Sequence, residues 1–230
     1  MTKPVTIKVM ATAAFKEAYL ELVPQFEHAS GHKVVTTWAS NSDVVTRVLA
    51  GELTDLMVMS ADAVDKLIAA GKVAKDGRVD IATSWVAAAV KKGAARPDIS
   101  SAEAFKRSML AAKSIAYSFG PSGVYLVGLF QRMGISMQLA GKVQQIKGEP
   151  VGAVVARGDA EIGFQQMSEL IAVRGIDIIG ALSKDIEQIT TFSTGRHAQS
   201  QMADAAHALS AFFKASAAHA IIRAKGMEPI

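Results

Sequence analysis

The first 71 residues alternate three times between a strand pattern and a helix pattern. The three predicted strands are rich in β-branched and apolar residues and cover 5–10, 33–38 and 55–59. Each is followed by an amphipathic stretch that stops at a glycine, at Gly31, Gly51 and Gly71. Because strands that alternate with helices form a parallel sheet covered by helices, the pattern predicts an α/β fold.

Small or polar turns follow these three strands and point to a ligand site. In open α/β sheets ligands bind at the carboxyl ends of the strands. The first amides of each following helix lack helical partners and favour an anion. We therefore predict ligand contacts at Thr12, Ala13, Ala14, Ser40, Asn41, Ser42 and Ser60.

The second half repeats the strand–turn–helix order around Tyr117–Tyr125, whose turn contains Gly120, Pro121 and Ser122. Ser122 is placed either as a helix N-cap or as a donor to a bound oxyanion, and both alternatives stay open. Gln165 and Gln166 follow a buried strand, where carboxamides need partners that a ligand can supply. The contacts predicted from this half are Tyr117, Ser118, Ser122, Gly123, Val151, Gln165 and Gln166.

Composition excludes several classes of protein. The chain has no cysteine, so disulfides and thiolate metal sites are excluded, and its five histidines lack metal-ligand spacing. The net charge of +4 is scattered and aromatic residues make up 6%, which does not predict a nucleic-acid surface. No apolar run reaches the roughly 18–20 residues of a membrane span. We expect no cofactor and no metal.

The start of the chain leaves two alternatives for localisation. Met1-Thr2-Lys3 leads almost directly into a strand, without the apolar region of a signal peptide. Either the protein is cytoplasmic, or a signal peptide has been removed and Met1 supplied in its place.

Taken together, these segments resemble the type 2 periplasmic solute-binding proteins, most closely the molybdate-binding branch. The resemblance rests on the order and spacing of 9–15, 34–35, 38–42 with Arg47, 61–62, 121–125, 149–151 and 162–163. It implies a two-lobed type 2 fold in which each lobe is a mainly parallel sheet flanked by helices. It also implies an anion held between lobe I, residues 1–82 and 196–230, and lobe II, residues 83–195. Family members are periplasmic and serve ABC-transporter permeases, and we expect a monomer.

Three positions depart from the molybdate-type pocket. Ala14 and Asn41 stand where that family has serines, and Gln166 aligns near its pocket tyrosine. Losing these hydroxyls predicts a carboxylate-bearing organic acid rather than molybdate or tungstate. The chain also resembles the aconitate isomerase-type relatives of this branch, most clearly at 19–24, 148–158 and 162–170.

Two functions of different classes follow from this resemblance. One is a binding protein that captures an organic anion and delivers it to a permease. The other is an isomerase of an unsaturated tricarboxylate, which needs a group to remove and return a carbon-bound proton. The candidates for that group are Tyr117, Tyr125, Glu149 and His197. Because none has a telling neighbour in sequence, we place binding first and expect no turnover of aconitate.

Overall fold

The computed structural model describes residues 3–230, so the question of whether Met1 is native lies outside the described part. The chain forms two compact units. The first unit joins the chain up to Thr83 with Thr191–Ile230, and the second unit is Ser84–Thr190. From the sequence we placed the two boundaries at 82/83 and 195/196. Both lie inside strands that continue from one unit into the other, β4 (Val73–Lys91) and β9 (Ile189–His197).

The three predicted strands of the first unit are present and parallel. They are β1 (Thr6–Ala11), β2 (Lys33–Trp38) and β3 (Leu56–Ser60), and β1 lies between the other two. The crossover strand β9 pairs with β3 in the antiparallel direction, and the short β10 (Glu228–Pro229) pairs with β4. The sheet is therefore mixed, with parallel strands extended by antiparallel ones.

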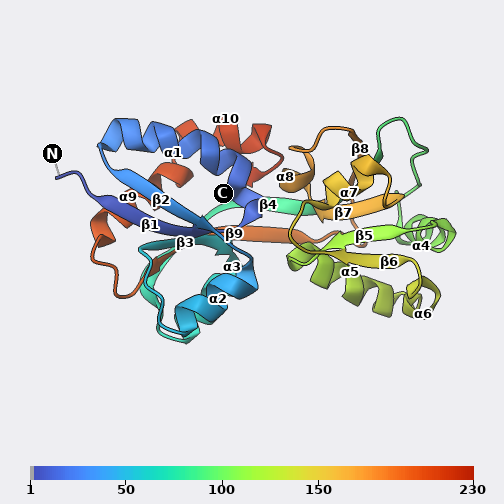
Figure 1. The fold of residues 1–230 in the computed structure, drawn as a ribbon, viewed down its shortest axis with the longest axis horizontal. Coiled ribbons are helices and arrows are strands. Elements are labelled where there is room, and N and C mark those ends of the chain that lie inside the picture. Colours follow the sequence, from blue (N-terminus) through green and yellow to red (C-terminus); the bar gives the residue numbers. More distant parts are fainter. Residues whose placement is uncertain (1–2) are drawn as a thin grey trace. The chain divides into compact units, whose positions relative to one another are not determined.

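Helices cover both faces of this sheet. One buried cluster contains residues of α1 (Lys16–Ser30), α9 (Ala203–Lys214) and α10 (Ser216–Ala224) packed on β1. The other contains α2 (Asn41–Leu49) and α3 (Ala61–Ala69). Figure 1 shows α1 and α10 together on one side of the strands and α2 and α3 on the other. A short 3-10 turn, η1 (Ala13–Phe15), leads into α1.

The second unit repeats the arrangement. Its parallel strands are β5 (Ile115–Ser118), β6 (Val143–Ile146) and β7 (Ile162–Gln166), with β5 in the middle. The strand β4 pairs antiparallel with both β7 and β8 (Ile176–Ala181).

One face of this second sheet packs against α4 (Ala102–Ala111), α5 (Pro121–Arg132) and α6 (Ser136–Leu139). The other packs against α7 (Val151–Arg157) and α8 (Met167–Leu170), as Figure 1 shows. In both units a turn between a parallel strand and a helix therefore lies at the carboxyl edge of the sheet. Within residues 3–230, every helix is too short or too polar to cross a bilayer.

Candidate functional site

The predicted loops of the first unit are tied together at the carboxyl edge of its sheet. The amide of Thr12 donates to Val58 O at 2.9 Å, which joins the loop after β1 to β3. The amide of Ser60 donates to the Oδ1 of Asn41 at 3.2 Å, which joins the loop after β3 to the start of α2. Asn41 thus holds two loops together through its oxygen and keeps its amide group as a donor.

Ser40 and Ser42 belong to the N-terminal cap of α2. The Ser40 Oγ accepts from the Asp43 amide at 3.1 Å, donates to the Asp43 carboxylate at 2.7 Å and lies 2.9 Å from the Ser42 Oγ. This network satisfies the start of the helix, and Asp43 already offsets the helix dipole. Ala13 and Ala14 lie in η1, where they offer only backbone groups to a ligand.

In the second unit, the turn between β5 and α5 is closed by hydroxyls. The Oγ atoms of Ser118 and Ser122 lie 2.7 Å apart and both side chains are buried. The Gly120 amide donates to the Ser118 Oγ at 3.2 Å, and the Gly123 amide donates to Gly120 O at 3.0 Å. Ser122 is therefore a buried partner of Ser118, and either hydroxyl can be the donor in the hydrogen bond between them.

The adjacent edge of the same sheet carries a short hydrogen-bond chain. The Val151 amide, at the start of α7, donates to Gln165 Oε1 at 2.9 Å. The Gln165 Nε2 in turn donates to Glu169 Oε1 at 2.8 Å. We expected Val151 and Gln165 to offer these groups to a ligand. In the structure these groups hydrogen-bond to each other and to Glu169, and their contact with a ligand stays a prediction.

Gln166 is the predicted contact with an open hydrogen-bonding position. Its Nε2 donates to Thr190 Oγ1 at 2.9 Å, and the residue is 1% exposed. Its Oε1 is buried and has no hydrogen-bond partner within the part of the chain that the structure describes. Since buried polar atoms are nearly always paired, this oxygen points to a group that completes the site.

Sequence reasoning missed Glu169. The residue is half-buried on α8, and burial raises its pKa from the ordinary value of 4.5 to about 7, against the lowering effect of hydrogen bonds from Gln165 and the Gln166 amide. The sequence carried one signal, because Gln166 and Glu169 have the spacing of a helix N-cap and its third residue. The burial that changes the carboxyl's acidity is not visible in the sequence.

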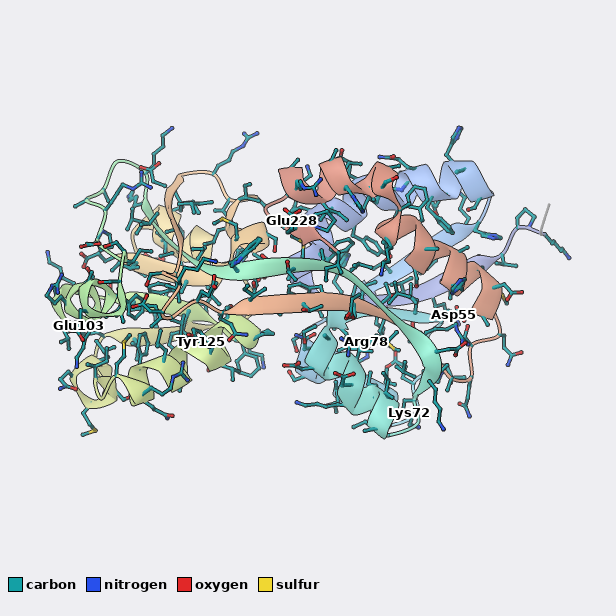
Figure 2. All side chains as sticks on the ribbon, turned by 180° about the vertical axis from the view of Figure 1, so that it is seen from behind. Asp55, Lys72, Arg78, Glu103, Tyr125 and Glu228 are labelled. Atoms are coloured by element: carbon teal, nitrogen blue, oxygen red, sulfur yellow. The ribbon has the colours of Figure 1, made fainter. Side chains whose placement is uncertain are left out.

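The proton carriers suggested by the sequence are less suitable. The Tyr125 hydroxyl donates to Ile186 O at 2.8 Å, on the α5 side of the sheet (Figure 2). Tyr117 packs against the hydrophobic cluster on the same face. Glu149 is exposed and paired with Arg157 at 2.7 Å, which holds the pKa of this carboxyl below its usual range.

His197 lies at the edge of the first sheet where β3 begins, away from the predicted ligand loops. In the antiparallel pairing of β3 with β9, Ser60 faces Phe192 and Leu56 faces Arg196, so His197 lies near the amino end of β3. Its amide donates to Asp55 O at 3.1 Å, and burial lowers the pKa of its imidazole. Asp55 and Lys72 mark this end of the unit in Figure 2. His197 therefore lies at the opposite end of β3 from the loops at Thr12, Asn41 and Ser60.

Three arginines already have acidic partners. Each forms an ion pair with a neighbouring acid: Arg47 with Glu52, Arg157 with Glu149, and Arg196 with Asp76. Among residues 3–230, no group of three or more histidines, aspartates and glutamates is placed to hold a metal ion. Whether the loops of the two units contact one ligand stays a prediction.

Comparison with known proteins gives this geometry a context. The chain is 40% identical to aconitate isomerase from Pseudomonas sp over 231 residues, which cover 98% of this chain and 88% of that protein. It is 26% identical to the molybdate-binding protein ModA from Escherichia coli (strain K12), over 78% of this chain and 72% of that protein.

The fold class predicted from the sequence is confirmed by solved structures. The periplasmic molybdate-binding protein of Azotobacter vinelandii superposes with a TM-score of 0.77 at 19% identity, covering 96% of this chain and 98% of that chain. The sequence profile described as bacterial extracellular solute-binding protein matches residues 7–228. The chain therefore belongs to the bacterial extracellular solute-binding protein family, in a branch whose relatives include molybdate binders and an aconitate isomerase.

Proposed function

We propose that this protein is an isomerase of an unsaturated tricarboxylate of the aconitate class. The observation that carries the proposal is the 40% identity, across 98% of the chain, to a protein named aconitate isomerase. The match to a molybdate-binding protein is weaker, at 26% identity over a shorter part of the chain. The proposal reverses the order of our expectation from sequence alone, which placed binding without turnover first.

The second unit supplies groups that suit such a substrate. Ser118 and Ser122 are buried hydroxyls at the start of α5, where the helix dipole favours a carboxylate. Gln166 offers a carboxamide with an unpaired oxygen. That oxygen requires a donor, such as a protonated carboxyl, and neither an ionised carboxylate nor molybdate can donate to it. Asn41 and Gln166 stand where the resemblance to molybdate binders implies hydroxyls, which favours an organic acid over a tetrahedral ion.

A second candidate function is capture of the same class of acid for a membrane permease. It is favoured by the family itself, whose profile is that of extracellular solute-binding proteins. In that case the protein is periplasmic, binds one small anion and performs no chemistry. Both functions require carboxylate recognition, so turnover is what distinguishes them.

The test of the proposal is to incubate purified protein with cis-aconitate or trans-aconitate and to follow both isomers by chromatography. We expect conversion from either side, at a rate proportional to protein concentration. Binding with the isomer ratio left at the uncatalysed value would support capture and contradict the isomerase proposal.

Ligand selectivity is measured by thermal unfolding in the presence of molybdate, sulfate and a series of di- and tricarboxylates. A ligand at about 100 times its dissociation constant stabilises the folded state by roughly 2.7 kcal/mol. We expect stabilisation by aconitate and little by molybdate. Tight molybdate binding without a carboxylate response would contradict both carboxylate functions.

A further inference from the structure

The pairing of β7 with β4 shows on which face of the second sheet the open oxygen of Gln166 lies. Gln166 pairs with Val86, and two residues earlier Phe164 pairs with Ala88. Val86, Ala88 and Phe164 belong to the hydrophobic cluster that packs against α4, α5 and α6. Because successive side chains of a strand point to opposite faces, Gln166 lies on this face and Gln165 on the other. The unpartnered Gln166 Oε1 is therefore on the α5 side, at the carboxyl end of β7.

Two hydrogen bonds connect this carboxamide to α5 through one short segment. The Tyr125 hydroxyl of α5 donates to Ile186 O at 2.8 Å. The Gln166 Nε2 donates to Thr190 Oγ1 at 2.9 Å. The segment 186–190 thus joins α5 to the end of β7 on one face of the sheet, within the second unit.

The first turn of α5 supplies donors at the same edge of the sheet. The helix begins with Pro121, which has no N–H. The amides of 123–124 both donate to Gly120 O, at 3.0 and 3.2 Å. In the described chain this leaves the Ser122 amide as the open donor of the turn, where the Ser122 hydroxyl also contacts that of Ser118. Free amides at a helix N-terminus favour a carboxylate.

The Gln166 oxygen asks for a different group, because it can only accept a hydrogen bond. At neutral pH a carboxyl with a pKa of about 4.3 is protonated in about one molecule in 500, so donating from it weakens binding about 500-fold. One hydrogen bond that satisfies a buried polar atom strengthens binding by about 5- to 150-fold. A hydroxyl carries its proton at neutral pH and donates without that loss. The favoured partner of this oxygen is therefore a hydroxyl.

We infer that Gln166 selects ligands with a hydroxyl beside their carboxylates, so that the site takes hydroxy-tricarboxylates as well as aconitate. The inference rests on the proposed function for the carbon skeleton, because adding water to the double bond of aconitate gives an acid with the same skeleton and one hydroxyl. That hydroxyl donates to Gln166 Oε1, and a carboxylate accepts from the Ser122 amide. Such an acid competes with aconitate for the site.

The experiment compares three acids that share this skeleton. Tricarballylate has no hydroxyl, citrate carries one on the central carbon, and isocitrate carries one on a neighbouring carbon. Isothermal titration calorimetry near neutral pH gives the dissociation constant of each. We expect at least one hydroxy acid to bind about 10-fold or more tightly than tricarballylate and to compete with aconitate.

Gln166→Met tests the residue itself. Methionine is unbranched and flexible, so it fills the space of glutamine without the carboxamide. We expect this variant to bind the three acids with similar dissociation constants. Gln138→Met is the matched control and should keep the wild-type preference, because Gln138 is exposed on α6, which follows the C-terminal end of α5.

A second variant acts on the orientation of the carboxamide. Thr190→Val removes the hydroxyl that accepts from Gln166 Nε2 and leaves Gln166 in place. We expect it to reduce the preference for the hydroxy acids. If Gln166→Met does not fold, Thr190→Val decides the matter: an unchanged preference in Thr190→Val, or in a folded Gln166→Met, overturns the role of Gln166.

Proton uptake distinguishes a hydroxyl donor from a carboxyl donor. Titrations in buffers of different ionisation enthalpy report how many protons are taken up with each ligand. A hydroxyl donor predicts no more uptake with the preferred hydroxy acid than with tricarballylate. An additional uptake of about one proton per ligand would mean that a protonated carboxyl donates to Gln166, which overturns the inference.

Failure of this inference can be told apart from failure of the proposed function. If neither aconitate nor any of the three acids binds, the proposed function fails and the inference fails with it. If aconitate binds and is converted while tricarballylate binds as tightly as citrate and isocitrate, only the inference is overturned. A carboxamide that turns its N–H groups toward the ligand would give that second result.

Discussion

Replacing Gly123 by alanine is expected to destabilise the protein by about 3 kcal/mol or more and to abolish ligand binding. Gly123 lies in the first turn of α5, directly behind the Ser118–Ser122 hydroxyl pair. A Cβ at this position would overlap the carbonyl oxygen of Ser118 and press on the ring of Tyr117. The oxygen belongs to the backbone at the end of β5, so it cannot move aside without opening the turn.

The matched control is Gly128→Ala on the same helix. A Cβ at Gly128 meets only the end of the Arg132 side chain, at 3.3 Å, which is flexible. Alanine in a helix interior is more stable than glycine by roughly 0.5–1 kcal/mol, so this variant should be neutral or stabilised. Urea unfolding of both variants and thermal shift with aconitate measure the effect. Equal stability of the two variants would contradict the close packing of the Ser118 carbonyl oxygen against Gly123.

The alternation of strands and helices could be predicted because local pattern determines it. The predicted strands of the first unit appear as β1, β2 and β3 with parallel pairing. The first half of β4, residues 73–83, was not predicted, because charged residues interrupt its apolar pattern. In the fold these charges have partners: Arg78 pairs with Asp80 at 2.8 Å, and Ser193 Oγ donates to Asp80 at 2.6 Å. The bond between Ser193 and Asp80 joins chain segments far apart in sequence, which a local pattern does not show.

The candidate site shows the same division between local and long-range information. The positions of the loops at the carboxyl edges followed from the strand–turn–helix order. Which polar groups already have hydrogen-bond partners could not be predicted, because those partners come from elsewhere in the chain. Gln165 accepts a hydrogen bond from the Val151 amide, whereas Gln166 donates one to Thr190. The position of His197 could not be predicted, because the direction in which β9 pairs with β3 is a property of the sheet. Glu169 was missed because its acidity depends on burial.

The raised pKa of Glu169 makes the stability of the protein depend on pH. The pKa of Glu169 is raised from 4.5 to about 7 in the folded protein, so the folded state holds this proton more tightly than the unfolded chain. Below about pH 4.5 both states are protonated and there is no penalty. Between pH 4.5 and about 7 the unfolded chain ionises first, and stability is lost. At about 1.4 kcal/mol per pH unit, the loss reaches about 3 kcal/mol and stays constant at higher pH.

Glu169→Gln should therefore match wild type in stability near pH 4.5 and exceed it by about 3 kcal/mol at about pH 8. The difference between the two proteins isolates this carboxyl, because every other group titrates alike in both. Urea unfolding at several pH values provides the measurement, and Glu103→Gln, which changes an exposed carboxylate, should follow wild type throughout. A stability difference independent of pH would mean that Glu169 titrates as an ordinary glutamate.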